Sequence, residues 1–171
     1  AQNRLKGVGF LSREDAINYG VTGPSGRGSG WACDVRKRSP YAAYDKVQFD
    51  EVLYNEGDSY ARYMVRMKEI EQSLHILEQL VDNIPEGDYL AKTKPIIKVP
   101  EGRYFKEVEA ARGAFGIYLE SRGDKFPYRL KVNSPGFNLV GAVDHMTRGS
   151  KIADLIAIGG SLDYVVPDID R

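Results

Sequence analysis

The 171-residue sequence contains a single cysteine, Cys33, and no C-x-x-C motif. One thiol excludes a disulfide within the chain, and it excludes ligation of an iron–sulfur cluster by this chain alone. No run of about 18 apolar residues is present, and no signal peptide is visible. Any iron–sulfur cluster that works with this chain is therefore expected in another subunit.

The chain also lacks net charge, since its 24 basic side chains match its 24 acidic ones. A bulk basic field for nucleic-acid binding is therefore excluded. The charges are nevertheless uneven: residues 1–40 hold seven basic and three acidic groups, whereas residues 41–90 hold four basic and eleven acidic groups. This asymmetry fits either two solvated faces or docking surfaces for partner subunits.

The clearest predicted element is a helix over residues 59–84, with Asp58 as its N-cap and Pro85 after its end. Its apolar residues recur at intervals of three and four, which is the spacing of one helical face. They are Tyr63, Met67, Ile70, Leu74, Leu77, Val81 and Ile84. This pattern favours a buried core helix over a coiled coil.

The remaining pattern predicts short elements. A small antiparallel sheet is expected from strands at 103–109, 116–121 and 128–133, and short helices are expected at 13–19 (capped by Ser12), 138–147 and 151–158. Residues 4–11 suggest a short strand or an extended entry, and residues 47–52 suggest a weak strand. Residues 22–30 suggest a loop, and residues 88–100 a connector. The fold class is therefore α+β: one long core helix plus short helices with a small antiparallel sheet. We expect one domain over residues 1–171, and the start at Ala1 suggests a fragment of a larger subunit.

The glycine-rich stretch Gly23–Gly30 does not fit a phosphate-binding loop. A Walker loop needs lysine after its last glycine, whereas Ser29 follows Gly28 here. A dinucleotide fingerprint needs a strand before it and a helix after it, and neither is predicted. The pattern Gly-Pro-x-x-Arg-x-Ser-Gly, followed by Asp34-x-Arg36-Lys37 and Pro40-Tyr41, instead resembles a family of NADH-quinone oxidoreductase (respiratory complex I) proteins, the large core subunits of D type.

Three further stretches resemble the same family: Glu109–Gly113, Pro127–Pro135 and the C-terminal tail Ser161–Arg171. Related nickel-iron hydrogenase large subunits have D-P-C-x-x-C in this tail. Asp163 keeps the aspartate, but the two cysteine positions are Val165 and Asp168, which argues against nickel. The resemblance covers roughly Asn3–Arg171 and implies the C-terminal part of a hydrogenase-like large subunit fold.

The resemblance implies that the tail lines a quinone cavity beside the terminal iron–sulfur cluster. Val165 would form an apolar wall, Asp163 and Asp168 would supply buried acceptors, and Arg171 would pair with one of them. Structural roles are implied for Tyr164, Arg27, Asp34 and Arg36. No residue is expected to be catalytic or to bind a metal.

The histidine and tyrosine that hold the quinone head in the family lie in its N-terminal half. His75 and His145 do not match that motif and are expected at the surface. The chain would therefore own neither the quinone head site nor the NAD site, which belongs to another subunit.

The implied function is that of a core subunit that couples electron transfer to proton translocation and is inactive as an isolated fragment. Implied partners are the iron–sulfur small subunit, the C-type subunit of the same complex and the membrane subunit at the quinone site. The expected location is peripheral, on the cytoplasmic face of the bacterial inner membrane. Two alternatives stay open at this point: an energy-converting hydrogenase-type large subunit, and a non-catalytic assembly module.

Overall fold

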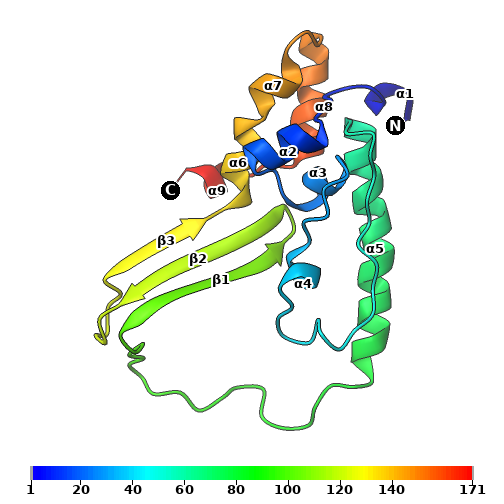
Figure 1. The fold of residues 1–171 in the computed structure, drawn as a ribbon. Coiled ribbons are helices and arrows are strands. Elements are labelled where there is room, and N and C mark those ends of the chain that lie inside the picture. The colour runs from blue at the N-terminus through cyan, green and yellow to red at the C-terminus, as the bar shows by residue number, and fades with distance from the viewer. Residues whose placement is uncertain (1, 171) are drawn as a thin grey trace.

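The computed structural model describes residues 2–170, in which helices surround one end of a small sheet (Figure 1). The helices are α1 (Gln2–Leu5), α2 (Arg13–Tyr19), α3 (Gly23–Arg27), α4 (Val35–Arg38), α5 (Ser59–Val81), α6 (Pro135–Gly141), α7 (Val143–Thr147), α8 (Ile152–Leu162) and α9 (Val166–Ile169). The strands are β1 (Gly102–Ala110), β2 (Gly113–Ser121) and β3 (Arg129–Asn133). The predicted α+β class is confirmed.

The sheet is antiparallel with the order β1-β2-β3, as the alternating pattern predicted. The register places Ile117 opposite Lys106 on β1 and opposite Val132 on β3. Only Ala111 and Arg112 separate β1 from β2, so this tight turn holds Arg112 at the end of the sheet next to the helices. Strand β2 begins three residues earlier than predicted.

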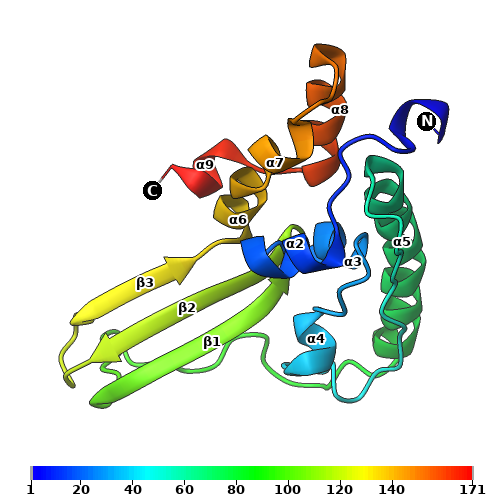
Figure 2. The same ribbon diagram turned by 45° about the horizontal axis from the view of Figure 1, so that its top comes forward.

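The main core lies between the N-terminal helices and the C-terminal helices, which are far apart in sequence but adjacent in both views (Figure 2). It consists of Leu11, Ala16, Val21, Leu139, Ala142, Met146, Ile158 and Leu162. Local capping sets the helix ends around it. Ser12 accepts a hydrogen bond from the Asp15 backbone N–H, and Gly20 ends α2 in the left-handed conformation at φ 69°. The predicted helix over 13–19 is therefore confirmed.

Helix α5 starts where predicted, since the Asp58 carboxylate accepts the backbone N–H of Ala61 at 2.7 Å. The helix ends at Val81, three residues earlier than expected. Its buried side carries Ala61, Arg62, Val65 and Ile76. The predicted burial of its apolar face is wrong within the described residues: the side chains from Tyr63 to Ile84 in that pattern are between 40% and 73% exposed.

Several short elements differ from expectation. Residues 4–11, expected as a short strand or an extended entry, begin with the end of helix α1 and contain no strand. Residues 47–52 also form no strand, and Val47 and Phe49 pack against Ile76 of α5 instead. The loop expected at 22–30 contains helix α3. Two helices, α6 and α7, replace the single helix expected at 138–147. Helix α6 starts early, with Ser134 as its N-cap and Pro135 in its first turn, and Ala142 separates it from α7.

The connector between α5 and β1 spans residues 82–101, has no helix or strand and is exposed at almost every position. It runs along the side of the molecule away from α6–α9 (Figure 1). No helix in the described part of the chain is both long and apolar enough to cross a membrane.

Candidate functional site

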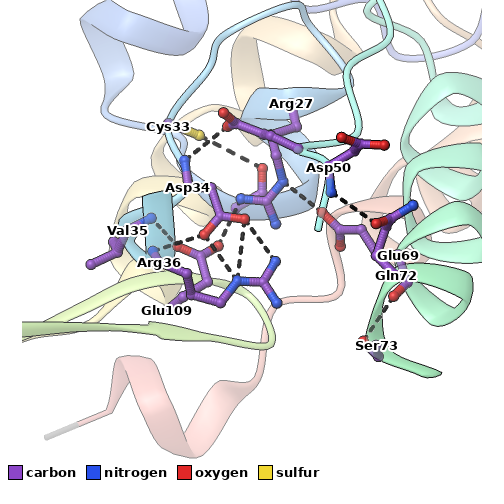
Figure 3. Close-up of polar contacts among 12 residues, drawn as sticks. Arg27, Cys33, Asp34, Val35, Arg36, Asp50, Glu69, Gln72, Ser73 and Glu109 are labelled. Atoms are coloured by element: carbon purple, nitrogen blue, oxygen red, sulfur yellow. Dashed lines mark hydrogen bonds and ion pairs between the residues drawn. The ribbon is translucent and has the colours of Figure 1, made fainter. Parts of the chain in front are cut away.

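Arg27 of helix α3 lies at the centre of a buried group of charges (Figure 3). Its Nε donates to Glu69 Oε1 of α5 at 2.6 Å, and its Nη1 donates to Glu109 Oε1 of β1 at 2.8 Å. One guanidinium therefore joins the glycine-rich stretch, the long helix and the sheet. The side chains of Arg27 and Glu109 are only 2% and 5% exposed, so neither charge can rely on water.

A second ion pair adjoins this one. Asp34 caps helix α4 and accepts two side-chain N–H groups of Arg36, the closer from Nη2 at 2.7 Å. Glu109 Oε2 accepts the backbone N–H of Val35 at 3.0 Å, which links the two pairs. We refer to Arg27, Asp34, Arg36, Glu69 and Glu109 as the ionic cluster.

The charges in the ionic cluster shift one another's pKa values. Burial alone would lower the pKa of Arg27, but Glu69 and Glu109 raise it above its usual value. Burial raises the pKa of Glu109 despite the opposing charge of Arg27. Burial alone would raise the pKa of Asp34, but its hydrogen bond to Arg36 and the charge of Arg27 lower it.

Close backbone approach explains the glycines beside the cluster. Gly23 starts α3 with φ +69°, and a Cβ placed there would lie 2.5 Å from the Cα of Gly113 at the start of β2. The thiol of Cys33, near the ionic cluster, is buried, and burial raises its pKa to about 12, so it is a poor nucleophile.

The ionic cluster therefore holds α3, α5 and β1 together and offers no reactive nucleophile among these residues.

The tail is held at two points. Asp163 ends helix α8 at φ 56°, and its Oδ2 lies 3.2 Å from Nε of Arg112, which also donates to the Asp163 carbonyl. Farther along, the hydroxyl of Ser134, the N-cap of α6, donates to the Asp168 carboxylate. Val165 lies between these two attachments, next to the β1–β2 turn. The attachments at Asp163 and Asp168 therefore hold it in place.

The tail and this turn line an open hollow. Its lining residues are Ala110, Ala111, Arg112, Phe115, Pro135, Val165 and Asp168. The hollow is mostly apolar, with one cation and one carboxylate at its edge. Such a lining offers apolar contact to a ligand and one cationic hydrogen-bond donor, the guanidinium of Arg112.

Of the residues named from the tail, the structure brings Val165 and Asp168 into this hollow and pairs Asp163 with one of its lining residues. Tyr164 lies elsewhere, near Gly159 of α8. Arg171 lies outside the described residues. The structure brings Arg27, Asp34 and Arg36 together in the ionic cluster, which is separate from the hollow.

Sequence reasoning missed Glu69, Glu109, Arg62 and Arg66 as parts of charged sites. The available signals were the matching stretch Glu109–Gly113, which contains Glu109, and the spacing of Arg62 and Arg66, one helical turn apart in α5. His75 and His145 are exposed, as predicted. Among residues 2–170, no three His, Cys, Asp or Glu side chains gather in an arrangement that would hold a metal ion.

Comparison with known proteins matches the chain to the family model described as respiratory-chain NADH dehydrogenase, 49 Kd subunit, over residues 1–98 and 91–171. The NADH-quinone oxidoreductase C/D-type subunit of Bacteroides fragilis is 69% identical over all 171 residues, which is 32% of that protein. The protein of the same name from Phocaeicola vulgatus is 68% identical over the same length, which is 33% of it. The NADH-quinone oxidoreductase D-type subunit of Desulfotalea psychrophila is 54% identical over 169 residues, which is 45% of it.

The chain thus spans about a third of the two C/D-type relatives and less than half of the D-type relative. The match to the family model nevertheless covers it from end to end, and its two parts overlap in the exposed connector. The chain belongs to the family of the 49 kDa subunit of respiratory-chain NADH dehydrogenase.

Proposed function

We propose that this chain is the C-terminal part of a core subunit of a proton-translocating NADH-quinone oxidoreductase, and that its tail forms one wall of the cavity where quinone is reduced. The relatives' names support the first part of the proposal. The second part rests on one observation: the tail is held by Arg112 and Ser134 so that Val165 and Asp168 face a mostly apolar hollow.

The residues of the hollow suit a role in placement rather than in electron transfer. Val165, Phe115 and Pro135 would contact a quinone ring and exclude water from it. Reduction places negative charge on the quinone oxygens, and the guanidinium of Arg112 would stabilise that charge. Electrons would arrive from an iron–sulfur cluster held by the neighbouring small subunit, and NAD would bind in another subunit.

The ion pair between Arg112 and Asp163 would respond to the negative charge on a reduced quinone. Both side chains are partly exposed, at 37% and 45%, so their mutual attraction is weak and can be altered by a nearby anion. A reduced quinone would compete with Asp163 for Arg112. In the assembled complex, this change at the end of α8 would be one step in coupling to proton translocation.

The same proposal implies which subunits the chain contacts and where in the cell the complex lies. Its partners would be the iron–sulfur small subunit, the C-type subunit and the membrane subunit at the quinone site. The protein would sit peripherally on the cytoplasmic face of the bacterial inner membrane, attached through those partners. A hydrogenase-type nickel site is disfavoured because the Val165 side chain has no atom able to bind a metal.

The test is to narrow the hollow in an assembled complex. This chain would replace the matching third of the B. fragilis C/D-type subunit, with which it shares 69% identity. Val165→Trp should lower quinone reductase activity at least tenfold while electron transfer from NADH to an artificial acceptor stays unchanged. Val166→Trp, at a neighbouring side chain that is 63% exposed and outside the hollow, is the matched control.

Equal quinone kinetics in the two variants would contradict the cavity proposal. Loss of both activities in Val165→Trp would instead indicate failed assembly, and a quinone analogue bearing a photoreactive group would then decide the matter. Its attachment to residues 163–168 supports the cavity wall, and its absence there leaves the role of an assembly module.

A further inference from the structure

Helix α5 presents an apolar face that nothing in the described part of the chain covers. We call Tyr63, Met67, Ile70, Leu74, Leu77 and Val81 the α5 stripe. Each of these side chains is at least 40% exposed, and they extend along nearly the whole helix. Helices α3 and α8 contact α5 elsewhere, and α5 forms one edge of the molecule in both ribbon views (Figures 1 and 2). A continuous apolar face of this length marks an interaction surface.

Two arginines flank the stripe on the side that faces α8. Arg62 is fully buried, and all of its hydrogen bonds go to neutral oxygens, including Ser161 Oγ at 2.9 Å and Gly9 O at 2.8 Å. Arg66 is half-buried and donates only to the carbonyls of Arg62 and Leu162. Within residues 2–170, no salt bridge to a carboxylate forms at either guanidinium.

This absence is unusual for buried cations, which normally pair with a carboxylate. Burial and the neighbouring charge of Arg66 lower the pKa of Arg62, and the attraction of Asp58 offsets this only in part. Burial also lowers the pKa of Arg66, against the attraction of Asp163 and Glu69, neither of which forms a salt bridge with it. A carboxylate in contact with Arg66 would supply the direct ion pair that this side chain lacks within residues 2–170 and would offset its repulsion of Arg62.

The structure has room for such a group. A hollow between α5 and α8 opens beside the stripe, and Arg66, Ser59 and Ser161 form its polar part. Its apolar part is made by Leu5, Tyr63 and Ala157. Tyr63 belongs to both the stripe and the hollow, so a single ligand covering the stripe reaches Arg66 without leaving the surface.

We propose that the α5 stripe is the docking surface for the part of the subunit that the relatives carry outside the matched stretch, and that this part places a carboxylate beside Arg66. The relatives match 98–100% of this chain, yet the chain fills only 32–46% of them. More than half of each relative therefore lies elsewhere in the same polypeptide. A segment tethered in this way meets the stripe at high effective concentration.

The occupant therefore has a defined chemistry: an apolar segment, long enough to cover about five helical turns of α5, with an Asp or Glu near its contact with Tyr63. The inference depends on the family and on the length of its members. It does not depend on the proposed quinone cavity, because the two hollows share no lining residue.

The first experiment measures protection of the stripe in the chimeric B. fragilis C/D-type subunit, purified alone without the other subunits. Leu74→Cys and His75→Cys are matched variants, because these neighbouring side chains are 56% and 54% exposed in the present structure. Maleimide labelling, followed by mass spectrometry of the peptide, should be at least a hundredfold slower at position 74 than at position 75.

Equal labelling at the two positions would overturn the proposal. Protection of position 74 that appears only in the assembled complex would assign the stripe to another subunit, and protection that depends on protein concentration would assign it to a second copy. A chimera that does not fold would also contradict the proposal, because the rest of the B. fragilis subunit would then not pack on the α5 stripe.

The second experiment identifies the carboxylate. In the same chimera, Arg66→Lys supplies an amine that a carbodiimide joins directly to a carboxylate in contact with it. Mass spectrometry should find residue 66 linked to an Asp or Glu outside the matched stretch, whereas the native Lys68, on the opposite flank of the stripe, should link only to Glu71, which lies 2.9 Å away. A link from residue 66 only to Asp163, or no link at all, would refute the paired carboxylate.

Discussion

Arg27 and Glu109 stand 82 residues apart in the sequence, yet their charged atoms meet at 2.8 Å in a site that excludes water. The contact joins helix α3 to strand β1 beside α5, where Glu69 completes the group at 2.6 Å. The two halves of the chain on either side of the connector are therefore held by charge as well as by the apolar core.

Replacing Arg27 by Leu should lower the free energy of unfolding by about 3–5 kcal/mol, because Glu69 and Glu109 would remain buried without their partner. Urea denaturation followed by circular dichroism measures the change. Arg38→Leu is the control, since Arg38 is 52% exposed and its pair with the 22% exposed Glu107 lies near the surface, where such pairs contribute under about 1 kcal/mol. A similar decrease in the free energy of unfolding in the two variants would mean that the buried ion pairs stabilise the fold no more than a surface pair does.

Gly23→Ala should destabilise the fold by about 2–4 kcal/mol, through left-handed backbone strain and overlap with the β2 backbone. Gly141→Ala is the matched control, because a Cβ there meets nothing within 4 Å and the position is helical. That change should stabilise the protein by about 0.5–1 kcal/mol. Thermal unfolding of both variants checks the opposite signs, and a neutral Gly23→Ala would contradict the close approach of α3 to β2.

Cys33 should be alkylated by iodoacetamide about a thousandfold more slowly in the native protein than in denaturant at pH 8, since burial raises its pKa from 9.0 to about 12 and only the thiolate reacts. The folded pKa lies above the unfolded one, so stability is fully present below about pH 9 and is lost as the pH rises toward 12. Cys33→Ala should flatten that loss. Comparable alkylation rates in the two states would show that the thiol is accessible.

Asp34→Asn should cost about 2 kcal/mol at pH 7, because charge-assisted bonds to Arg36 and a helix cap are weakened together. The folded pKa of Asp34 lies below its usual value of 3.8, so this stability is present above that pH and is lost as the pH falls through the folded pKa. The difference between the two proteins should therefore shrink in acid. Urea titrations at pH 7 and pH 3 test it, and Asp88→Asn in the connector should change stability by under about 0.5 kcal/mol.

The sequence predicted best those helices and strands that depend on neighbouring residues. The caps at Ser12 and Asp58 lie beside the helices that they start, and alternation in β3 depends only on neighbouring residues. The strand expected at 47–52 failed because Val47 and Phe49 satisfy their apolar surface against α5 rather than in a sheet. The stripe of α5 was located correctly, but periodicity identifies an apolar face without showing what covers it.

The candidate site divides in the same way. The roles of Arg27, Asp34 and Arg36 were implied by resemblance to a family. The ion pairs of Arg27 with Glu69 and Glu109 could not be predicted, because pairing between residues distant in sequence leaves no local pattern. The tail residues Val165 and Asp168 came from resemblance to a family. Arg112, which holds Asp163, was noticed only as part of a matching stretch.

The exposed connector has a practical consequence for handling this protein. A protease cut within residues 82–101 would break no helix, strand or buried ion pair, so the two pieces should stay bound to each other through α3, α5 and β1. The same segment is a natural place to insert a reporter, because lengthening a flexible loop costs little entropy. Genetically split halves of the chain, joined only by contacts made after synthesis, should therefore reassemble.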